Sequence, residues 1–319
     1  MPTSRSPRHG PPPPGPAPRY VGIRTFARVP HIQDLEGVDV ACLGIPFDTT
    51  TAYRPGARFG PEAIRANSVL LRAYDPELGV DVFDQLSVVD WGDVPVVPGN
   101  AVATLDRISD TLAPMLSQGV TPLVFGGDHS VTLGELRAHA RHRGPVALVL
   151  FDAHADTWND SYGERYFHST VFRRATEEGL IEPSRSTMVG MRGPLFGPED
   201  ADAPRELGFE VVPGPQLEDL SPTELAERVR RRAGDADIFL SFDIDVIDPA
   251  WAPGTGTPEV AGLTPHKALG CLRALAGLPF IGFDVVEVAP PYDPVGQPTA
   301  MLAANVAWLM LALCGLRPA

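Results

Sequence analysis

The sequence is poor in lysine and in positive charge generally. Lys267 is its only lysine, and 26 Lys and Arg residues stand against 40 Asp and Glu residues, giving a formal net charge of −14. Nucleic acids and anionic membrane surfaces are bound by clusters of Lys and Arg. The composition therefore argues against nucleic acid and membrane as partners, and a negative field favours cationic ligands.

Cysteine and long apolar segments are also scarce. Cys42, Cys271 and Cys314 lie far apart without a CxxC pair, which predicts neither a disulfide framework nor a zinc knuckle. These cysteines, and a polar N-terminus without an apolar signal core, indicate a cytoplasmic protein. The apolar stretch 301–316 contains Asn305 and is shorter than the roughly 20 residues of a membrane span. We expect it to form a buried C-terminal helix.

The remaining chain alternates between short apolar runs and longer helical stretches. Residues 1–18 include four consecutive prolines and predict a disordered or extended tail, whereas residues 19–319 predict a single domain. Most runs are apolar throughout, as in parallel strands buried on both faces. Their alternation with helix starts such as 221–224 predicts an α/β fold with helices on both faces of one parallel sheet. The eight runs are residues 38–45, 86–91, 121–125, 145–151, 187–191, 209–212, 238–242 and 280–285.

Acidic residues and histidines follow three of these runs directly. His129 lies in the sequence GGDHS at 126–130, and two further motifs are DAHAD at 152–156 and DID at 243–245. Ligands of open α/β sheets bind at the carboxyl ends of strands, so the three motifs could meet at one edge. In an extended chain, alternate residues share a face. We therefore expect convergence of Asp152, His154 and Asp156, and likewise of Asp243 and Asp245.

This set of two imidazoles and four carboxylates predicts metal binding. Crowded, unpaired carboxylates at buried strand ends repel one another at a desolvation cost that cations remove. The donors suit two divalent ions, with manganese as first expectation and nickel, zinc, iron or cobalt as alternatives. Each motif alone is often only a turn, a helix cap or a loop acid, but three such motifs after three strands favour metal ligands. Glu287, after the last run, and His168, in a loop, gain no role from their residue types alone.

These motifs, in this order, resemble those of the ureohydrolases, the family of arginase, agmatinase and related amidinohydrolases. The resemblance implies a three-layer α/β/α fold around an eight-stranded parallel sheet, two manganese ions per subunit and assembly as a homotrimer or homohexamer. It also implies hydrolysis of a small guanidino compound to urea and a primary amine. The matching stretches are GGDHS at 126–130, DAHADT at 152–157, SFDIDVIDPAWAPGTGTPE at 241–259 and GFDVVEVAP at 282–290, with agmatinase-like YRPGARFGPEAIR at 53–65 and FRRATEEGL at 172–180.

The resemblance also assigns roles to single residues. Glu287 would receive the guanidinium, and Asp156 and His168 would assist proton transfer to the leaving amine. Ser169 departs from the family, which commonly has glycine after this histidine, and it puts the shape of the specificity loop in question. One metal would be held by His129, Asp152, Asp156 and Asp243, and the other by His154, Asp152, Asp243 and Asp245, with Asp152 and Asp243 bridging.

Residues 158–167 form the candidate specificity loop, and they carry mixed signals. Agmatine, which would yield putrescine, is the first expectation because agmatinase-like segments outnumber arginase-specific ones. Asp160 or Glu164 could pair with its distal ammonium, and Asn159 belongs to the same candidate set. Arg165 could instead pair with the carboxylate of 4-guanidinobutyrate, 3-guanidinopropionate or a proclavaminate-type guanidino acid.

Two other classes of protein deserve comparison. Metal-dependent deacetylases share a related fold but use one zinc, and the doubled carboxylate set argues against them. A catalytically silent homologue would usually have lost metal ligands, and here all six are present.

Overall fold

Eight parallel strands form the central sheet of the computed structural model, which describes residues 9–13, 15 and 17–317. Their order is β4-β1-β5-β10-β9-β6-β7-β8, and each arises from one of the eight apolar runs. A separate antiparallel pair joins β2 (Tyr74–Asp75) and β3 (Val80–Asp81). The sheet strands are β1 (Val40–Gly44), β4 (Val88–Asp93), β5 (Thr121–Phe125), β6 (Ala147–Phe151), β7 (Thr187–Val189), β8 (Glu210–Val212), β9 (Ile238–Asp243) and β10 (Phe280–Val286).

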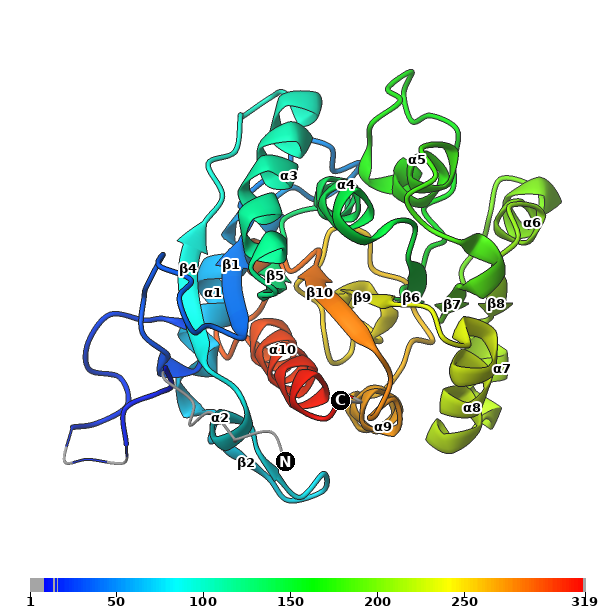
Figure 1. The fold of residues 1–319 in the computed structure, drawn as a ribbon. Coiled ribbons are helices and arrows are strands. Elements are labelled where there is room, and N and C mark those ends of the chain that lie inside the picture. The colour runs from blue at the N-terminus through cyan, green and yellow to red at the C-terminus, as the bar shows by residue number, and fades with distance from the viewer. Residues whose placement is uncertain (1–8, 14, 16, 318–319) are drawn as a thin grey trace.

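Helices cover both faces of this sheet and complete the three layers (Figure 1). Helices α3, α4 and α5 lie on one face, and α1, α8, α9 and α10 on the other. The expected α/β/α fold is therefore confirmed. The helices are α1 (Gly60–Asn67), α2 (Val82–Gln85), α3 (Ala101–Ser117), α4 (Val131–Arg143), α5 (Val171–Glu177), α6 (Pro198–Glu206), α7 (Gly214–Asp219), α8 (Pro222–Ala233), α9 (Pro265–Ala274) and α10 (Pro298–Gly315).

Each central strand contributes to two hydrophobic cores. In β1, Val40 and Cys42 pack toward α1 and α10, whereas Ala41 and Leu43 pack toward α3 and α4. Successive side chains of a strand point to opposite faces, so a strand covered on both sides must be apolar at every position. This explains why the runs lack alternation.

The apolar C-terminal stretch forms a buried helix, α10, as expected. Helix α10 is, among the described residues, the one helix long and apolar enough to cross a membrane, but 78% of it is buried inside the protein, as a core helix requires.

Of the expected tail, residues 1–8, 14 and 16 lie outside the described residues. His9 donates its amide to Ser87 Oγ at 3.1 Å and accepts from the Val88 amide at 2.9 Å, beside the start of β4.

The order of the strands decides where the site lies. Four neighbouring strands, β5, β10, β9 and β6, end at the same edge of the sheet because all are parallel. Polar residues lie at or shortly after the ends of these strands: His129 after β5, Glu287 after β10, Asp243 at the end of β9 and Asp152 after β6. Four segments that are far apart in sequence therefore deliver their polar residues to one place.

Candidate metal centre

A tight loop after β5 carries His129. A Cβ atom on Gly127 would lie 1.6 Å from the Phe47 carbonyl oxygen, so only glycine fits this approach. The buried Asp128 carboxylate holds the loop by accepting from the Thr50 amide at 2.9 Å, the Thr50 hydroxyl at 2.7 Å and the Ser130 amide at 3.1 Å. Burial raises the pKa of Asp128 to about 6, assisted by the charge of Glu287. The histidine is thus fixed by its neighbours in the chain.

His129 faces three carboxylates at short range. Its Nδ1 atom lies 3.1 Å from Asp152 Oδ2, 3.0 Å from Asp156 Oδ2 and 3.3 Å from Asp243 Oδ2. Both His129 and Asp152 are fully buried. One imidazole nitrogen cannot satisfy three carboxylates, so the group is arranged around a position that a cation can share.

A second group lies beside the first and uses Asp152 again. His154 Nδ1 lies 3.0 Å from Asp245 Oδ2 and 3.6 Å from Asp152 Oδ1. Backbone amides fix the acids, because Ala153 donates to Asp245 Oδ1 at 3.0 Å and Asp245 donates to Asp243 Oδ1 at 2.9 Å. In each group the candidate ligand atoms lie within 4.8 Å of one another. Asp152 is the residue that both groups share.

The expected convergence is therefore present, but its expected backbone is wrong. Strand β6 ends at Phe151, and Asp156 has a left-handed φ of +48°. Strand β9 ends at Asp243, and Asp245 lies in a 3-10 helix, Ile244–Val246. The side chains meet because these irregular turns fold them together, not because an extended chain alternates.

The charges of the cluster oppose burial. Burial, with the charges of Asp245 and Asp156, raises the pKa of Asp152 to about 6. Burial and the neighbouring Asp245 and Asp152 likewise raise the pKa of Asp243 well above its usual value. Burial disfavours a charged His129, but the three surrounding carboxylates raise its pKa well above the usual value. A divalent cation between these groups would compensate the negative charge.

Unpartnered buried atoms identify where a ligand fits. His129 Nδ1, Asp152 Oδ2 and Glu287 Oε2 are buried and have no hydrogen-bond partner among the described residues. Buried polar atoms are nearly always paired. Here a ring nitrogen and carboxylate oxygens point toward common positions, a donor set that suits divalent ions of hard to borderline character. The residues present fit a metal site.

Glu287 lies directly after β10 and next to the cluster. Its φ is +62°, its side chain is 1% exposed, and its Oε1 atom accepts from the His129 amide at 2.9 Å and from His168 Nδ1 at 2.8 Å. The other nitrogen of His168, Nε2, accepts from the Ala52 amide at 3.1 Å. Glu287 and His168 are therefore held together, and Glu287 Oε2 has no hydrogen-bond partner among the described residues and can bind a ligand.

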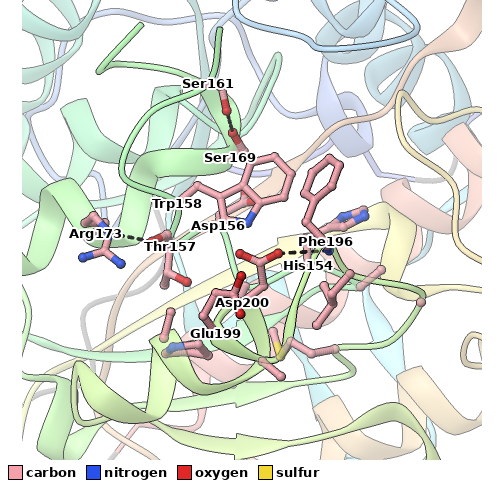
Figure 2. Close-up of a pocket in the computed structure, with 18 of the residues that line it drawn as sticks. His154, Asp156, Thr157, Trp158, Ser161, Ser169, Arg173, Phe196, Glu199 and Asp200 are labelled. Carbon is pink, nitrogen blue, oxygen red and sulfur yellow. Dashed lines mark hydrogen bonds between the residues drawn. The ribbon is translucent and has the colours of Figure 1, made fainter. Parts of the chain in front are cut away.

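A cavity of about 930 Å³ opens beside the cluster (Figure 2). His154, Asp156 and His168 line it, as do Asn159 and Asp160 of the candidate specificity loop. Figure 2 shows the loop closed by a contact between the Ser161 and Ser169 hydroxyls, which lie 2.5 Å apart. The loop thus has a defined shape rather than an open one.

Other parts of this loop lie elsewhere. Arg165 is exposed, forms an ion pair with Glu177 and is absent from the residues that line the cavity, as is Glu164. Arg173, from α5, does line the cavity; its Nε donates to the Thr157 carbonyl at 2.6 Å.

Two features of the site escaped the sequence analysis. Residues 191–206 form the opposite wall of the cavity, where Phe196 packs on Trp158 with ring centroids 5.5 Å apart and Glu199 and Asp200 lie beneath them (Figure 2). His129 Nε2 contacts Ser241 Oγ at 3.0 Å, and Ser241 contacts Asp284 Oδ1 at 2.6 Å. A sequence signal existed only for the second feature, since Ser241 and Asp284 are polar residues near or within apolar runs.

The largely buried group of His129, Asp152, His154, Asp156, Asp243 and Asp245, called the metal-type cluster below, is a candidate metal site at the carboxyl edge of a parallel sheet in an α/β protein. Comparisons with known proteins identify the class of enzyme. A model of the arginase family matches residues 38–312. The chain is 45% identical to mitochondrial agmatinase of Gallus gallus (92% of this chain, 86% of that one) and 44% identical to guanidinobutyrase of Pseudomonas aeruginosa (93% of each). The structure of proclavaminate amidino hydrolase from Streptomyces clavuligerus superimposes with a TM-score of 0.88 at 40% identity, covering 94% of this chain and 99% of that one.

The chain belongs to the arginase family. Within that family it is a ureohydrolase of the agmatinase and guanidino-acid hydrolase branch, a hydrolase acting on linear amidines. The family has a binuclear metal site, and the two His/Asp groups are the candidates for it in this chain. The implied substrate is a small guanidino compound.

Proposed function

We propose that this enzyme binds two manganese ions per subunit and hydrolyses agmatine to urea and putrescine, as a cytoplasmic homotrimer or homohexamer. The observation that carries the reaction is the juxtaposition of the metal-type cluster with Glu287. His129 Nδ1 lies within 3.3 Å of three carboxylates, and Glu287, whose Oε1 accepts from the His129 amide, has a second oxygen without a hydrogen-bond partner in the described chain. A cation-binding acid next to a metal pair suits a guanidinium substrate.

The six residues predicted from the sequence would hold the metals. His129, Asp152, Asp156 and Asp243 surround one position, and Asp152, His154 and Asp245 surround the other, with Asp243 joined to Asp245 through its amide. A bound metal pair supplies a nucleophilic water at neutral pH and neutralises the crowded carboxylates.

Glu287 would bind and orient the substrate. Its Oε2 atom is free to accept an N–H of the guanidinium, a charge-assisted hydrogen bond. Its Oε1 atom is held by the His129 amide and the His168 ring. Because Oε1 is held, Oε2 keeps a fixed position, and a guanidinium bound to it would be presented in one orientation to the nucleophile.

His168 and Asp156 would transfer protons, His168 to the departing amine and Asp156 from the attacking water. Burial disfavours a charged ring, but Glu287 raises the pKa of His168 to about 9. A neutral His168 accepts the Ala52 amide at Nε2, whereas a protonated ring has no free acceptor there and releases that bond. The released Nε2–H could protonate the departing amine, and Asp156, which lines the same cavity, could carry the proton taken from water.

Agmatine is preferred because acids line the cavity and Arg165 does not. Arg192 and Arg205 also line it, but their guanidinium groups donate to backbone carbonyls. Asp160, Glu199 and Asp200 line it, and Arg165 is paired with Glu177 outside it. One observation favours a guanidino acid instead. Arg173 lines the cavity and forms no ion pair with any described carboxylate, so it could bind a substrate carboxylate. The relatives include both an agmatinase and a guanidinobutyrase.

Urea release from manganese-loaded enzyme would be measured on agmatine, 4-guanidinobutyrate, 3-guanidinopropionate and arginine. We expect agmatine to have the highest kcat/KM. Asp160→Asn should then raise the KM for agmatine, and Arg173→Gln should leave it nearly unchanged. A preference for 4-guanidinobutyrate that Arg173→Gln abolishes would replace agmatine by a guanidino acid. No urea from any compound, with two metals bound, would refute the proposed reaction.

A further inference from the structure

A buried chain of three side chains runs from the metal-type cluster into the sheet. His129 Nε2 lies 3.0 Å from Ser241 Oγ, and Ser241 Oγ lies 2.6 Å from Asp284 Oδ1. All three side chains are fully buried. Ser241 is in β9 and Asp284 in β10, which are neighbouring parallel strands with these two residues in register.

The direction of each hydrogen bond follows from the partners of Asp284. Its Oδ2 accepts from the Thr132 hydroxyl at 2.7 Å, and its Oδ1 accepts from Ser241 and from the Phe242 amide at 3.3 Å. A carboxylate that accepts three donors must receive the Ser241 proton rather than give one. Ser241 can therefore only accept from the ring, so His129 carries its proton on Nε2.

This tautomer decides what His129 can do at the metal-type cluster. With the proton on Nε2, the lone pair of Nδ1 points toward Asp152, Asp156 and Asp243, where a cation would lie. A hydrogen bond from the outer nitrogen to an anionic network also makes the inner nitrogen a better electron donor. Without the network, the ring is free to rotate or to adopt the other tautomer.

We propose that Asp284, acting through Ser241, is a positioning residue that holds His129 in the orientation and tautomer needed to bind a divalent metal. The inference rests on the proposed function, because it takes His129 as a ligand. It goes further by assigning a metal-related role to two residues that touch neither substrate nor the candidate metal positions. Thr132, at the start of α4, anchors Asp284 from the opposite side.

The placement of a carboxylate here is otherwise unfavourable, which argues against a purely structural role. Asp284 lies in the middle of an apolar strand, and burial raises its pKa above the usual value despite its three donors. Its neighbour Glu135 is also fully buried and has both oxygens without a hydrogen-bond partner in the described chain. An apolar residue at position 284 would avoid this desolvation cost, so a strand built only for stability would not need Asp284.

The test measures metal binding and not only turnover. Metal-free wild type, Asp284→Asn, Ser241→Ala and the double variant would be titrated with Mn²⁺, with the free ion followed by electron paramagnetic resonance. Co²⁺ titrations would record the visible absorption of the bound ion. We expect each single variant to lower the affinity for one of the two ions about 10- to 100-fold, which is the usual effect of losing a hydrogen-bond partner of a metal-binding histidine. The double variant should be no weaker than the worse single variant, because the two residues act in series.

Asp90→Asn is the matched control. Asp90 is a buried carboxylate that accepts from the Phe26 amide and the Arg65 guanidinium at 2.8 Å each, on β4 at the far edge of the sheet. We expect it to lower the melting temperature without changing Mn²⁺ affinity or the Co²⁺ spectrum. Asp284→Asn and Ser241→Ala should change both the Mn²⁺ affinity and the Co²⁺ spectrum at a melting temperature similar to that of Asp90→Asn.

The outcomes separate the two proposals. Wild-type Mn²⁺ affinity and Co²⁺ spectrum in Asp284→Asn and Ser241→Ala would overturn the positioning role, as would fully additive losses in the double variant. Two tightly bound ions in the wild type without urea release would refute the proposed reaction and leave the positioning role to be judged by the variants. Failure of the wild type to bind two ions would overturn both.

Discussion

Two groups of buried polar side chains have atoms without protein partners, and they differ in what lies around those atoms. In the metal-type cluster, His129 Nδ1 lies within 3.3 Å of three carboxylates. On α4, Glu135 and His139 are also fully buried, and all four of their side-chain polar atoms lack hydrogen-bond partners in the described chain. Neither belongs to a group of candidate metal ligands among the described residues.

The charge states of the two groups explain the difference. Burial raises the pKa of Glu135 well above its usual value, which favours the neutral acid, and lowers that of His139 to about 3, so the ring of His139 is neutral at pH 7. In the cluster, opposite charges converge and raise the pKa of His129. Unpartnered buried atoms therefore indicate a cation site only where donors and charges converge, and elsewhere they mark groups that burial has neutralised.

The largest expected effect follows from removing Asp243, an acid that lies beside His129 in the cluster. Asp243→Ala should lower kcat/KM for the preferred guanidino compound by more than about 100-fold, beyond the range for outer partners of a metal. It should also reduce bound manganese below two ions per subunit, measured by elemental analysis. Chelation of the wild type should abolish urea release, and manganese should restore it.

Glu135→Gln is the control for this comparison, since it alters a buried carboxylate outside the cluster. We expect metal content and urea release within about twofold of wild type, because burial favours the neutral form of Glu135 and the uncharged amide of Gln resembles that form. A loss as large as that of Asp243→Ala would show that the two groups do not differ as argued. Near-normal activity in Asp243→Ala would contradict the metal assignment.

Glu287→Gln should have the next largest effect. The change removes the negative charge that faces the guanidinium but keeps the size of the side chain. Loss of a charge-assisted hydrogen bond is worth about 1.5–3 kcal/mol, which predicts a fall in kcat/KM of roughly 10- to 100-fold. Steady-state urea assays measure it, and manganese content should stay at two ions. Loss of metal instead would mean that Glu287 supports the cluster rather than the substrate.

The sequence predicted the strands and the ligand types better than the backbone between them. Continuous apolar runs identify parallel strands because both faces are buried, and all eight runs became strands. The left-handed turn at Asp156 and the 3-10 helix around Asp245 have no comparable local signal, since the surrounding loops impose them. The wall at residues 191–206 is brought to the cavity by the fold and is distant in sequence. Asp284 is visible in the sequence as a charge within an apolar run, but its contact with Ser241 depends on the pairing of β9 with β10.

His139 provides a prediction for stability rather than activity. Its folded-state pKa of about 3 lies below the unfolded value of about 6.5. Between these values the unfolded chain binds one more proton at this residue, so His139 should by itself lower the free energy of unfolding by about 1.4 kcal/mol for each pH unit below 6.5. Urea denaturation between pH 6.5 and 4.5 measures this slope in wild type and His139→Gln.

The variant should lose that part of the slope whatever its absolute stability. Glu135→Gln should make the slope steeper, because the raised carboxyl pKa lets the folded chain bind an extra proton above the usual value of 4.5, and this opposes the His139 contribution in the same pH range. Equal slopes in wild type and His139→Gln would show that His139 becomes protonated within the folded state. In that case its unpartnered nitrogens would resemble those of the cluster more than proposed.

The smallest effect is expected at the loop that borders the cavity. Ser169 closes the loop through its hydroxyl, which lies 2.5 Å from Ser161 Oγ, and through its carbonyl, which accepts the Trp158 amide at 3.1 Å. Ser169→Gly keeps only the second contact. Loss of one neutral, partly exposed hydrogen bond of about 1 kcal/mol should raise KM about two- to fivefold and leave kcat and metal content nearly unchanged.

Ser161→Ala removes the same bond from the other side without adding backbone freedom, so the two variants should match and the double variant should add nothing. A KM change in Ser169→Gly alone would assign the effect to glycine's backbone freedom and not to the hydroxyl pair.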